Sequence, residues 1–284
     1  MKKLIALILA MLMCFGILAA CGTETATDGT ANETETTVET EDATETTDNT
    51  EETFTFKHGF DLDYPPYSHV DDNGEISGFD VEMAQAVCEY LGWEYEAVPF
   101  NWDAKDAELN SYACDCIWSG ITVEGREDDY LWTIPYSNNS QMILVPEDSE
   151  IKTLDDLAGK IVGVQTATSA YDLLQDGQAD LCATFASLEV FETYTIAFND
   201  LQAGAIDAIA IDITSGNYLM SKNEGYKFLD ESIGSETYAI AFRKDDTELR
   251  DTVQDALLAL VDNGTFDEIG QKYPEIYDYL CLGK

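Results

Sequence analysis

Four residues have the chemistry to bind a small zwitterion. Arg126 is one of only three arginines in a chain with 56 acidic residues, and a guanidinium binds a carboxylate through two parallel hydrogen bonds. Thr168 and Ser169 supply hydroxyls and N–H groups at the start of a predicted helix. Asp212 can accept from an ammonium group. Each residue also has an ordinary alternative: a surface ion pair for Arg126, and helix capping for the other three.

Aromatic residues could form the walls of such a site. Tyr64, Trp102 and Trp118 offer flat apolar faces for stacking and for cation–π contact. Their alternative is the ordinary core, above all for Trp118, which lies on a predicted strand. Together with the charged groups, these residues predict a cage for a molecule with both a carboxylate and an ammonium group.

Catalysis finds little support in the sequence. General acid–base chemistry favours a histidine or a tuned carboxylate in a cleft, and the chain has only His58 and His69, without a nucleophile motif. The pair Cys114 and Cys116 lacks nearby histidine partners for a metal. We therefore expect a binding protein, not an enzyme, with no metal and no cofactor.

The cysteines do not suggest a disulfide framework. Beyond Cys14 and Cys21 there are five, and an odd number in an exported protein leaves at least one thiol free. We expect these five to be small buried apolar side chains: Cys88, Cys114, Cys116, Cys182 and Cys281.

Charge excludes several classes of partner. The 284 residues carry a formal net charge of −42, and from Phe54 onward 45 acids face 12 bases. Such a body repels phosphate backbones and anionic lipid, so nucleic-acid binding is not expected. About 230 residues suit one large or two ordinary domains.

The N-terminus has the pattern of an address. Lys2 and Lys3 precede the apolar run Leu4–Ala19, which is typical of an export signal. The run ends in Leu-Ala-Ala-Cys-Gly, which resembles the lipobox of bacterial lipoproteins. That resemblance implies a signal peptide over residues 1–20 and a lipid on Cys21; the alternative is an ordinary secretory signal. Residues 21–53 are rich in Thr and acids without aromatics, which predicts a disordered tether.

The body alternates short apolar strands with amphipathic helices, a pattern that predicts an α/β fold with mainly parallel sheets. The candidate residues mostly follow strands, where ligands of open α/β sheets bind. Strands are expected at Phe54–Gly59, Glu94–Val98, Cys116–Ser119, Ser140–Val145, Ile161–Val164, Ala205–Ile211 and Thr237–Phe242. The main helices are expected at Phe79–Leu91, Asp103–Leu109, Thr168–Leu174, Phe191–Ala203, Thr214–Ser221, Thr247–Asn263 and Thr265–Tyr273.

Several spaced motifs give the body a family resemblance. Over about residues 54–284 the chain resembles the family-3 extracellular solute-binding proteins, the amino-acid-capturing subunits of ABC importers. The motifs lie, in order, at Asp61–Tyr67, Ser77–Ala84, Ser119–Arg126, Val162–Thr168, Asp207–Asp212, Tyr238–Lys244 and Asp262–Phe266.

The resemblance implies a type II periplasmic-binding fold of two α/β lobes joined by a two-strand hinge. Lobe 1 would comprise 54–141 plus 236–284, and lobe 2 142–235. It further implies a monomer outside the cytoplasm, lipid-anchored to the outer face of the plasma membrane, that delivers a free amino acid to an ABC permease. Two alternatives remain: a sensor module that feeds no permease, and a dehydratase-type enzyme on the same scaffold.

The resemblance also divides the ligand among the candidate residues. Asp212 would take the α-ammonium group, Tyr64 and Trp102 would sandwich the ligand side chain, and Asp61 would read its tip. Two departures stand out: the stretch from Thr122 to Arg126 is one residue shorter than in commonly met members, and Trp118 replaces a small aliphatic residue, which implies a reshaped pocket. The α-carboxylate would be bound by Arg126, Thr122, the backbone of Ser119 and Gly120, and Thr168 and Ser169.

Overall fold

The computed structural model describes residues 53–284. The predicted signal peptide, Cys21 and the predicted tether up to residue 52 lie outside these described residues. Within residues 53–284, no helix has the length and apolar character needed to cross a membrane.

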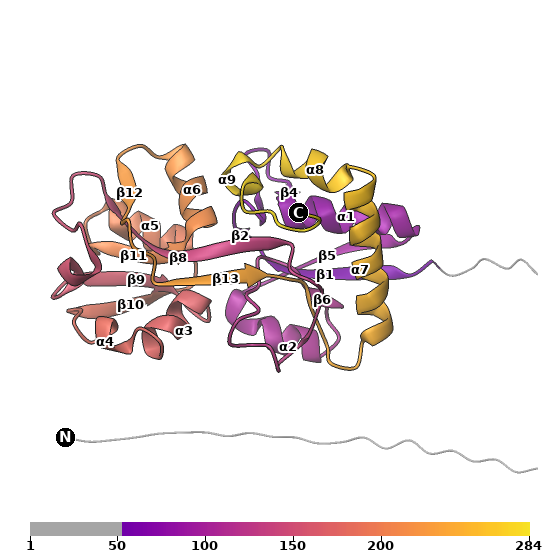
Figure 1. Cartoon of the computed structure of the whole chain (residues 1–284), viewed down its shortest axis with the longest axis horizontal. Helices are drawn as coiled ribbons and strands as arrows, with labels where there is room; N and C mark the ends of the chain where they lie inside the picture. The colour runs from indigo at the N-terminus through magenta and orange to yellow at the C-terminus, as the bar shows by residue number, and fades with distance from the viewer. Residues whose placement is uncertain (1–52) are drawn as a thin grey trace, which may run out of the picture. The chain divides into compact units, whose positions relative to one another are not determined.

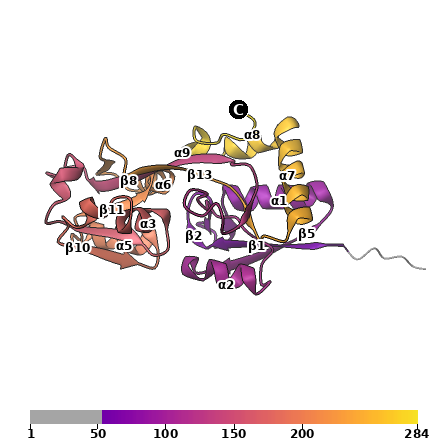
Figure 2. The same cartoon turned by 60° about the horizontal axis from the view of Figure 1, so that its bottom comes forward.

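The first sheet combines the N-terminal strands with a strand from late in the chain. Its order is β5-β1-β6-β14-β7, with β1 parallel to β5 and β6, and β14 antiparallel to β6 and β7. Helices α1 and α7 lie on one side of it and α2 on the other (Figures 1 and 2). The elements are β1 (Thr55–Asp61), β5 (Glu94–Phe100), β6 (Cys116–Ile117), β7 (Leu131–Trp132), β14 (Ala241–Phe242), α1 (Phe79–Leu91), α2 (Lys105–Asn110) and α7 (Thr247–Asp262).

The second sheet has the order β10-β9-β11-β8-β12, and β13 also pairs with β8. Alternate residues of β11 pack on opposite faces: Ile209 and Ile211 join the core cluster that contains α5, and Ala208 and Ala210 join the cluster that contains α3. The elements are β8 (Ser137–Pro146), β9 (Ile161–Gln165), β10 (Ser187–Phe191), β11 (Ala208–Asp212), β12 (Tyr226–Phe228), β13 (Gly234–Tyr238), α3 (Ser169–Gln175), α4 (Ala179–Cys182), α5 (Tyr194–Gln202) and α6 (Ile213–Lys222).

Two long strands carry the chain between the sheets. β8 and β13 pair antiparallel, from Tyr238 opposite Ser137 to Gly234 opposite Gln141, and run side by side from one half to the other (Figure 1). We call the half around the first sheet lobe 1 and the half around the second lobe 2. The predicted boundaries at 141/142 and 235/236 fall inside these strands; where each lobe ends stays a prediction.

Both sheets are mixed, so the prediction of mainly parallel sheets is wrong. β9, β10 and β11 are parallel to one another, but β8 is antiparallel to β11, β12 and β13. The reason is that the chain crosses between the two halves. A strand that enters one half from the other is antiparallel to the strands that follow helices within that half.

Helix α1 agrees with its prediction residue for residue. Gly78 precedes it at φ 133°, where a Cβ would lie 2.2 Å from the Tyr67 carbonyl oxygen, so only glycine fits. Gly92 ends it in the left-handed conformation. The apolar spacing and the glycine at its end made the helix recognisable in the sequence.

Other predictions need correction. The helix expected from Phe191 begins at Tyr194, because Phe191 is part of β10 and Thr193 caps the helix by accepting from the Ile196 N–H group. The strand expected over Thr237–Phe242 breaks into β13 and β14, because the chain changes sheets there. Short elements were not predicted: β2 (Asp63–Tyr64), β3 (Ser68–Val70), β4 (Ile76–Ser77), β7, β10, β12, α4 and α9 (Pro274–Tyr277).

Among the described residues all five cysteines are free. Cys88, Cys114 and Cys116 are buried, as expected, whereas Cys182 and Cys281 are half-buried. Burial raises the pKa of the Cys114 thiol to about 12, so it stays protonated and behaves as an apolar side chain.

Candidate functional site

One cavity collects the residues that the sequence singled out. Its lining combines the carboxyl ends of β1, β9 and β11 with the segment that follows β6, so it takes residues from both lobes. It contains all ten predicted ligand-binding residues and Gln165, which was not predicted: Asp61, Tyr64, Trp102, Ser119, Gly120, Thr122, Arg126, Gln165, Thr168, Ser169 and Asp212. Gln165 could have been found from its place as the last residue of a strand.

Arg126 reaches across the cavity from lobe 1. Its Nη2 lies 2.7 Å from Asp172 Oδ2 on α3 and 3.5 Å from the Ala167 carbonyl oxygen. The Trp102 indole N–H donates to that same carbonyl at 2.9 Å. Ala167 has φ 56°, an uncommon conformation for a residue with a Cβ. The side chains of Trp102 and Arg126, both from lobe 1, thus contact the backbone of Ala167 in lobe 2.

The two hydroxyls at the start of α3 already form hydrogen bonds. Thr168 caps the helix: its Oγ1 accepts from the Tyr171 N–H group at 3.2 Å and donates to the Gln165 carbonyl at 2.8 Å. Ser169 Oγ accepts from the Gln141 side-chain amide at 2.9 Å. The capping role weighed for Thr168 is therefore present in the structure.

Buried polar groups of lobe 1 form hydrogen bonds to the backbone of the Trp118–Gly120 segment. Asp80 Oδ2 accepts from the Gly120 N–H group at 2.9 Å and from the Tyr136 hydroxyl at 2.7 Å. His58 Nε2 donates to the Trp118 carbonyl at 2.6 Å, and burial lowers the His58 pKa to about 4, which keeps the ring neutral. Because its N–H group is directed at Asp80, Gly120 does not offer it to the cavity.

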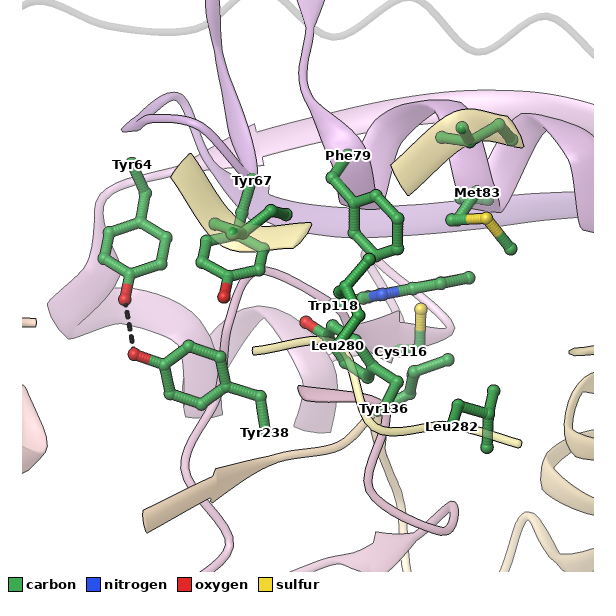
Figure 3. Close-up of a cluster of buried hydrophobic side chains, with 14 of the residues drawn as sticks. Tyr64, Tyr67, Phe79, Met83, Cys116, Trp118, Tyr136, Tyr238, Leu280 and Leu282 are labelled. Carbon is green, nitrogen blue, oxygen red and sulfur yellow. Dashed lines mark hydrogen bonds between the residues drawn. The ribbon is translucent and has the colours of Figure 1, made fainter. Parts of the chain in front are cut away.

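Trp118 does not line the cavity. It is 1% exposed, its ring packs edge-on with that of Tyr136, and it belongs to the same core cluster as Phe79 and Met83 (Figure 3). Its core alternative is therefore correct and Trp118 is not a wall of the cavity; that it reshapes the pocket stays a prediction. The side chain fills lobe 1 underneath the segment that borders the cavity.

Asp212 lines the same cavity from the end of β11. It is 3% exposed, and its Oδ1 accepts from Asn139 Nδ2 at 2.7 Å, from the Tyr238 hydroxyl at 2.6 Å and from Gln141 Nε2. Tyr64 hydrogen-bonds to the Tyr238 hydroxyl at 2.8 Å (Figure 3). Asn139, Gln141 and Tyr238 were not predicted; all three lie on the crossing strands.

Asp61 is a carboxylate enclosed by neutral donors. It is 4% exposed, with Oδ1 accepting from the Asp63 N–H group and Oδ2 from Gln165 Nε2, both at 2.9 Å. Burial raises its pKa to about 6, more than these hydrogen bonds lower it. The hydrogen bond to Gln165 joins the two lobes.

We expect Asp61→Asn to change how stability depends on pH. The pKa of Asp61 is raised in the folded protein, so its carboxyl favours the folded state when protonated, and that stability is lost as the pH rises from about 4 to about 6. Between pH 3 and pH 7, the free energy of unfolding of the wild type should fall by about 3 kcal/mol relative to Asp61→Asn. Urea unfolding across this range measures the difference; parallel curves would contradict it.

Two lobes of mixed α/β structure, two crossing strands and a cavity lined from both lobes define a binding protein of the type II periplasmic class. The chain belongs to the bacterial extracellular solute-binding proteins, family 3, whose profile matches residues 56–275.

Its relatives are binding proteins. The L-cystine-binding protein TcyJ of Escherichia coli K12 is 30% identical over 219 residues, covering 76% of this chain and 80% of that protein. The ABC transporter arginine-binding protein 1 of the same strain is 27% identical, covering 76% and 88%.

Solved structures show the same fold. A substrate-binding protein of an ABC uptake transporter from Streptococcus pneumoniae with bound histidine superposes with a TM-score of 0.75 at 29% identity, covering 78% of this chain and 92% of that one. An ancestral arginine-binding protein bound to arginine gives 0.72 at 30% identity, covering 78% and 98%. As expected, these relatives and solved structures are binding proteins.

Proposed function

We propose that this chain is the amino-acid-binding component of an ABC uptake system and captures a free amino acid between its lobes. The observation that carries the proposal is that Arg126 from lobe 1 and Asp212 from lobe 2 line the same cavity. A guanidinium and a carboxylate in one cavity match the two charged groups that every free amino acid carries.

The proposal assigns the α-carboxylate to Arg126, with Thr122, Ser119, Thr168 and Ser169 around it. Asp172, which pairs with Arg126 in this structure, has a side chain 60% exposed, so the α-carboxylate can replace it at little cost. The Gly120 N–H group is left out, since it donates to Asp80.

Asp212 takes the α-ammonium group. Tyr64 and Trp102 are the walls for the ligand side chain; both line the cavity and are almost fully buried. Asp61 and Gln165 border the same space and supply a carboxylate and an amide for the side-chain end.

Asp61 favours a ligand whose side chain ends in N–H groups. Relatives are named as binders of L-cystine, arginine and histidine. Far from the α-carbon, cystine carries a second ammonium group, arginine a guanidinium and histidine an imidazole. Each of these groups donates hydrogen bonds. A buried carboxylate accepts such donors and rejects an apolar tip, which would leave it without a ligand partner.

Binding would close the two lobes on each other. Asp61–Gln165, Trp102–Ala167 and Arg126–Asp172 each join lobe 1 to lobe 2. A ligand that contacts both lobes stabilises only the arrangement in which they meet, so it shifts the population toward the closed form. That form would be the one that a membrane permease recognises.

The N-terminal sequence places the protein outside the cytoplasm in this proposal. A basic start, an apolar run, small residues and Cys21 follow in the order of a lipoprotein signal. A lipid on Cys21 would hold the binding domain at the outer face of the plasma membrane, with residues 22–53 as the tether.

A thermal-shift panel of the twenty amino acids plus L-cystine tests the function. An amino acid at a hundred times its dissociation constant should stabilise the protein by about 2.7 kcal/mol. We expect the largest shift with arginine, histidine or cystine and none with leucine. The absence of a shift with all twenty-one compounds would contradict the proposed function.

A further inference from the structure

A second buried carboxylate, that of Glu236, shares hydrogen-bond donors with Asp212. Glu236 on β13 is 7% exposed. Its Oε1 accepts from Asn139 Nδ2 at 2.6 Å and from Gln141 Nε2 at 2.7 Å. Asp212 Oδ1 accepts from the same two amide groups. Two buried carboxylates therefore share one pair of donors.

No cation balances this pair within residues 53–284. None of the described Lys, Arg or His side chains hydrogen-bonds or forms an ion pair with Asp212 or Glu236, and Arg126 pairs with Asp172. Every observed partner is a neutral amide or hydroxyl. Two like charges this close in a buried place are not both stable, so one proton or one external cation must accompany them.

The donors are also too few. The Gln141 side-chain NH2 group has two hydrogens but lies near three oxygens, those of Ser169, Asp212 and Glu236. Gln141 Oε1 is buried and has no donor. A protonated carboxyl or a ligand ammonium would add the missing hydrogen to this group of side chains.

We propose that Glu236 is a positioning residue of the ammonium site: the Asp212–Glu236 pair holds one proton when no amino acid is bound and releases it to solvent when the α-ammonium group binds at Asp212. This inference rests on the proposed function. Glu236 does not line the central cavity and acts through Asp212 and the two shared amides. The ammonium replaces the proton as the positive charge that the pair requires.

The surrounding groups agree with this exchange. Burial, and next the charge of Asp212, raise the pKa of Glu236 to about 7, against the smaller effect of Ser169, Asn139 and Gln141. The other titratable groups around the pair are Tyr64, Tyr67 and Tyr194, with Tyr238 on β13 itself. Burial raises the pKa of all four phenols, so they stay neutral.

Calorimetry with L-arginine tests the exchange, because the charges of arginine stay constant between pH 5 and pH 8. In the wild type, binding should be about a thousandfold weaker at pH 5 than at pH 8: about a hundredfold comes from the Asp212–Glu236 pair and about tenfold from Asp61, whose pKa is about 6. The heat at pH 6 should depend on the ionisation enthalpy of the buffer. Glu236→Gln should lose most of this pH dependence. Glu124→Gln is the control: it removes an exposed carboxylate that accepts from the β13 residue Thr237, and it should behave like the wild type.

A measurement without ligand separates this proposal from the proposed function. In protein with 13C-labelled glutamate, one carboxyl carbon should titrate near pH 7 and should be missing in Glu236→Gln. If it is present but arginine does not bind, the proton is confirmed and arginine is excluded as the ligand. If no such carbon titrates, or if Glu236→Gln keeps the pH dependence of arginine binding, the proposal is overturned.

Discussion

Replacing Arg126 with alanine is expected to abolish amino-acid binding and leave the fold intact. Removing one partner from an enclosed charge pair costs about 2–5 kcal/mol, a loss of thirtyfold to several thousandfold in affinity. The free energy of unfolding should change by less than about 1 kcal/mol, because within residues 53–284 Arg126 forms one ion pair, and its partner Asp172 is exposed. Calorimetry measures the affinity, and urea unfolding measures the stability.

Asp172→Asn is the matched control for this experiment. It removes the same ion pair but keeps the guanidinium, so affinity should be equal or higher, because the α-carboxylate no longer competes with Asp172. Unchanged affinity in Arg126→Ala would show that Arg126 does not bind the α-carboxylate. Loss of binding in Asp172→Asn would show that the ion pair, and not the guanidinium alone, is required.

Asp212→Asn is expected to move binding and stability in opposite directions. The ammonium group loses its charged partner, which should cost about 2–5 kcal/mol of binding free energy. The ligand-free protein loses one of two neighbouring buried carboxylates, so its free energy of unfolding at pH 8 should stay equal or rise. A residue that functions in binding often lowers the stability of the ligand-free protein.

Asp207→Asn serves as the control, at the residue just before β11. Asp207 Oδ2 accepts from the Ile161 N–H group at 2.8 Å, outside the cavity. This variant should lose about 1 kcal/mol of stability and keep its affinity. If Asp212→Asn binds the amino acid as tightly as the wild type, the ammonium assignment is refuted.

The sequence allowed much of the cavity lining to be predicted. Asp61 and Asp212 each end a strand, and strand ends are where open α/β sheets bind ligands. Helix α1 was predictable to the residue because its apolar spacing is local and a glycine ends it. The position of Arg126 came from the resemblance to a family, since composition alone leaves a surface ion pair equally open.

The contacts between side chains of the crossing strands were beyond sequence reasoning, although strands were expected at Ser140–Val145 and Thr237–Phe242. Gln141 and Glu236 are hydrogen-bonded although 95 residues separate them in the chain, and no periodic pattern reports such a contact. On a strand with two buried faces, an amide or a carboxylate is not distinguishable from a surface residue. Strands of two or three residues, such as β2 and β12, are also too short to show alternation.

The paired crossing strands would set an order for ligand capture. Asp212 is hydrogen-bonded to Asn139 and Gln141 on β8 and to Tyr238 on β13, so it sits beside the pivot about which the lobes would swing. The contacts of Trp102 and Arg126 to Ala167 do not involve those strands. A swing would separate these contacts and keep the surroundings of Asp212 assembled. An incoming amino acid would bind first through its ammonium group at Asp212. Its carboxylate would be enclosed last, when Arg126 and Trp102 contact lobe 2 again.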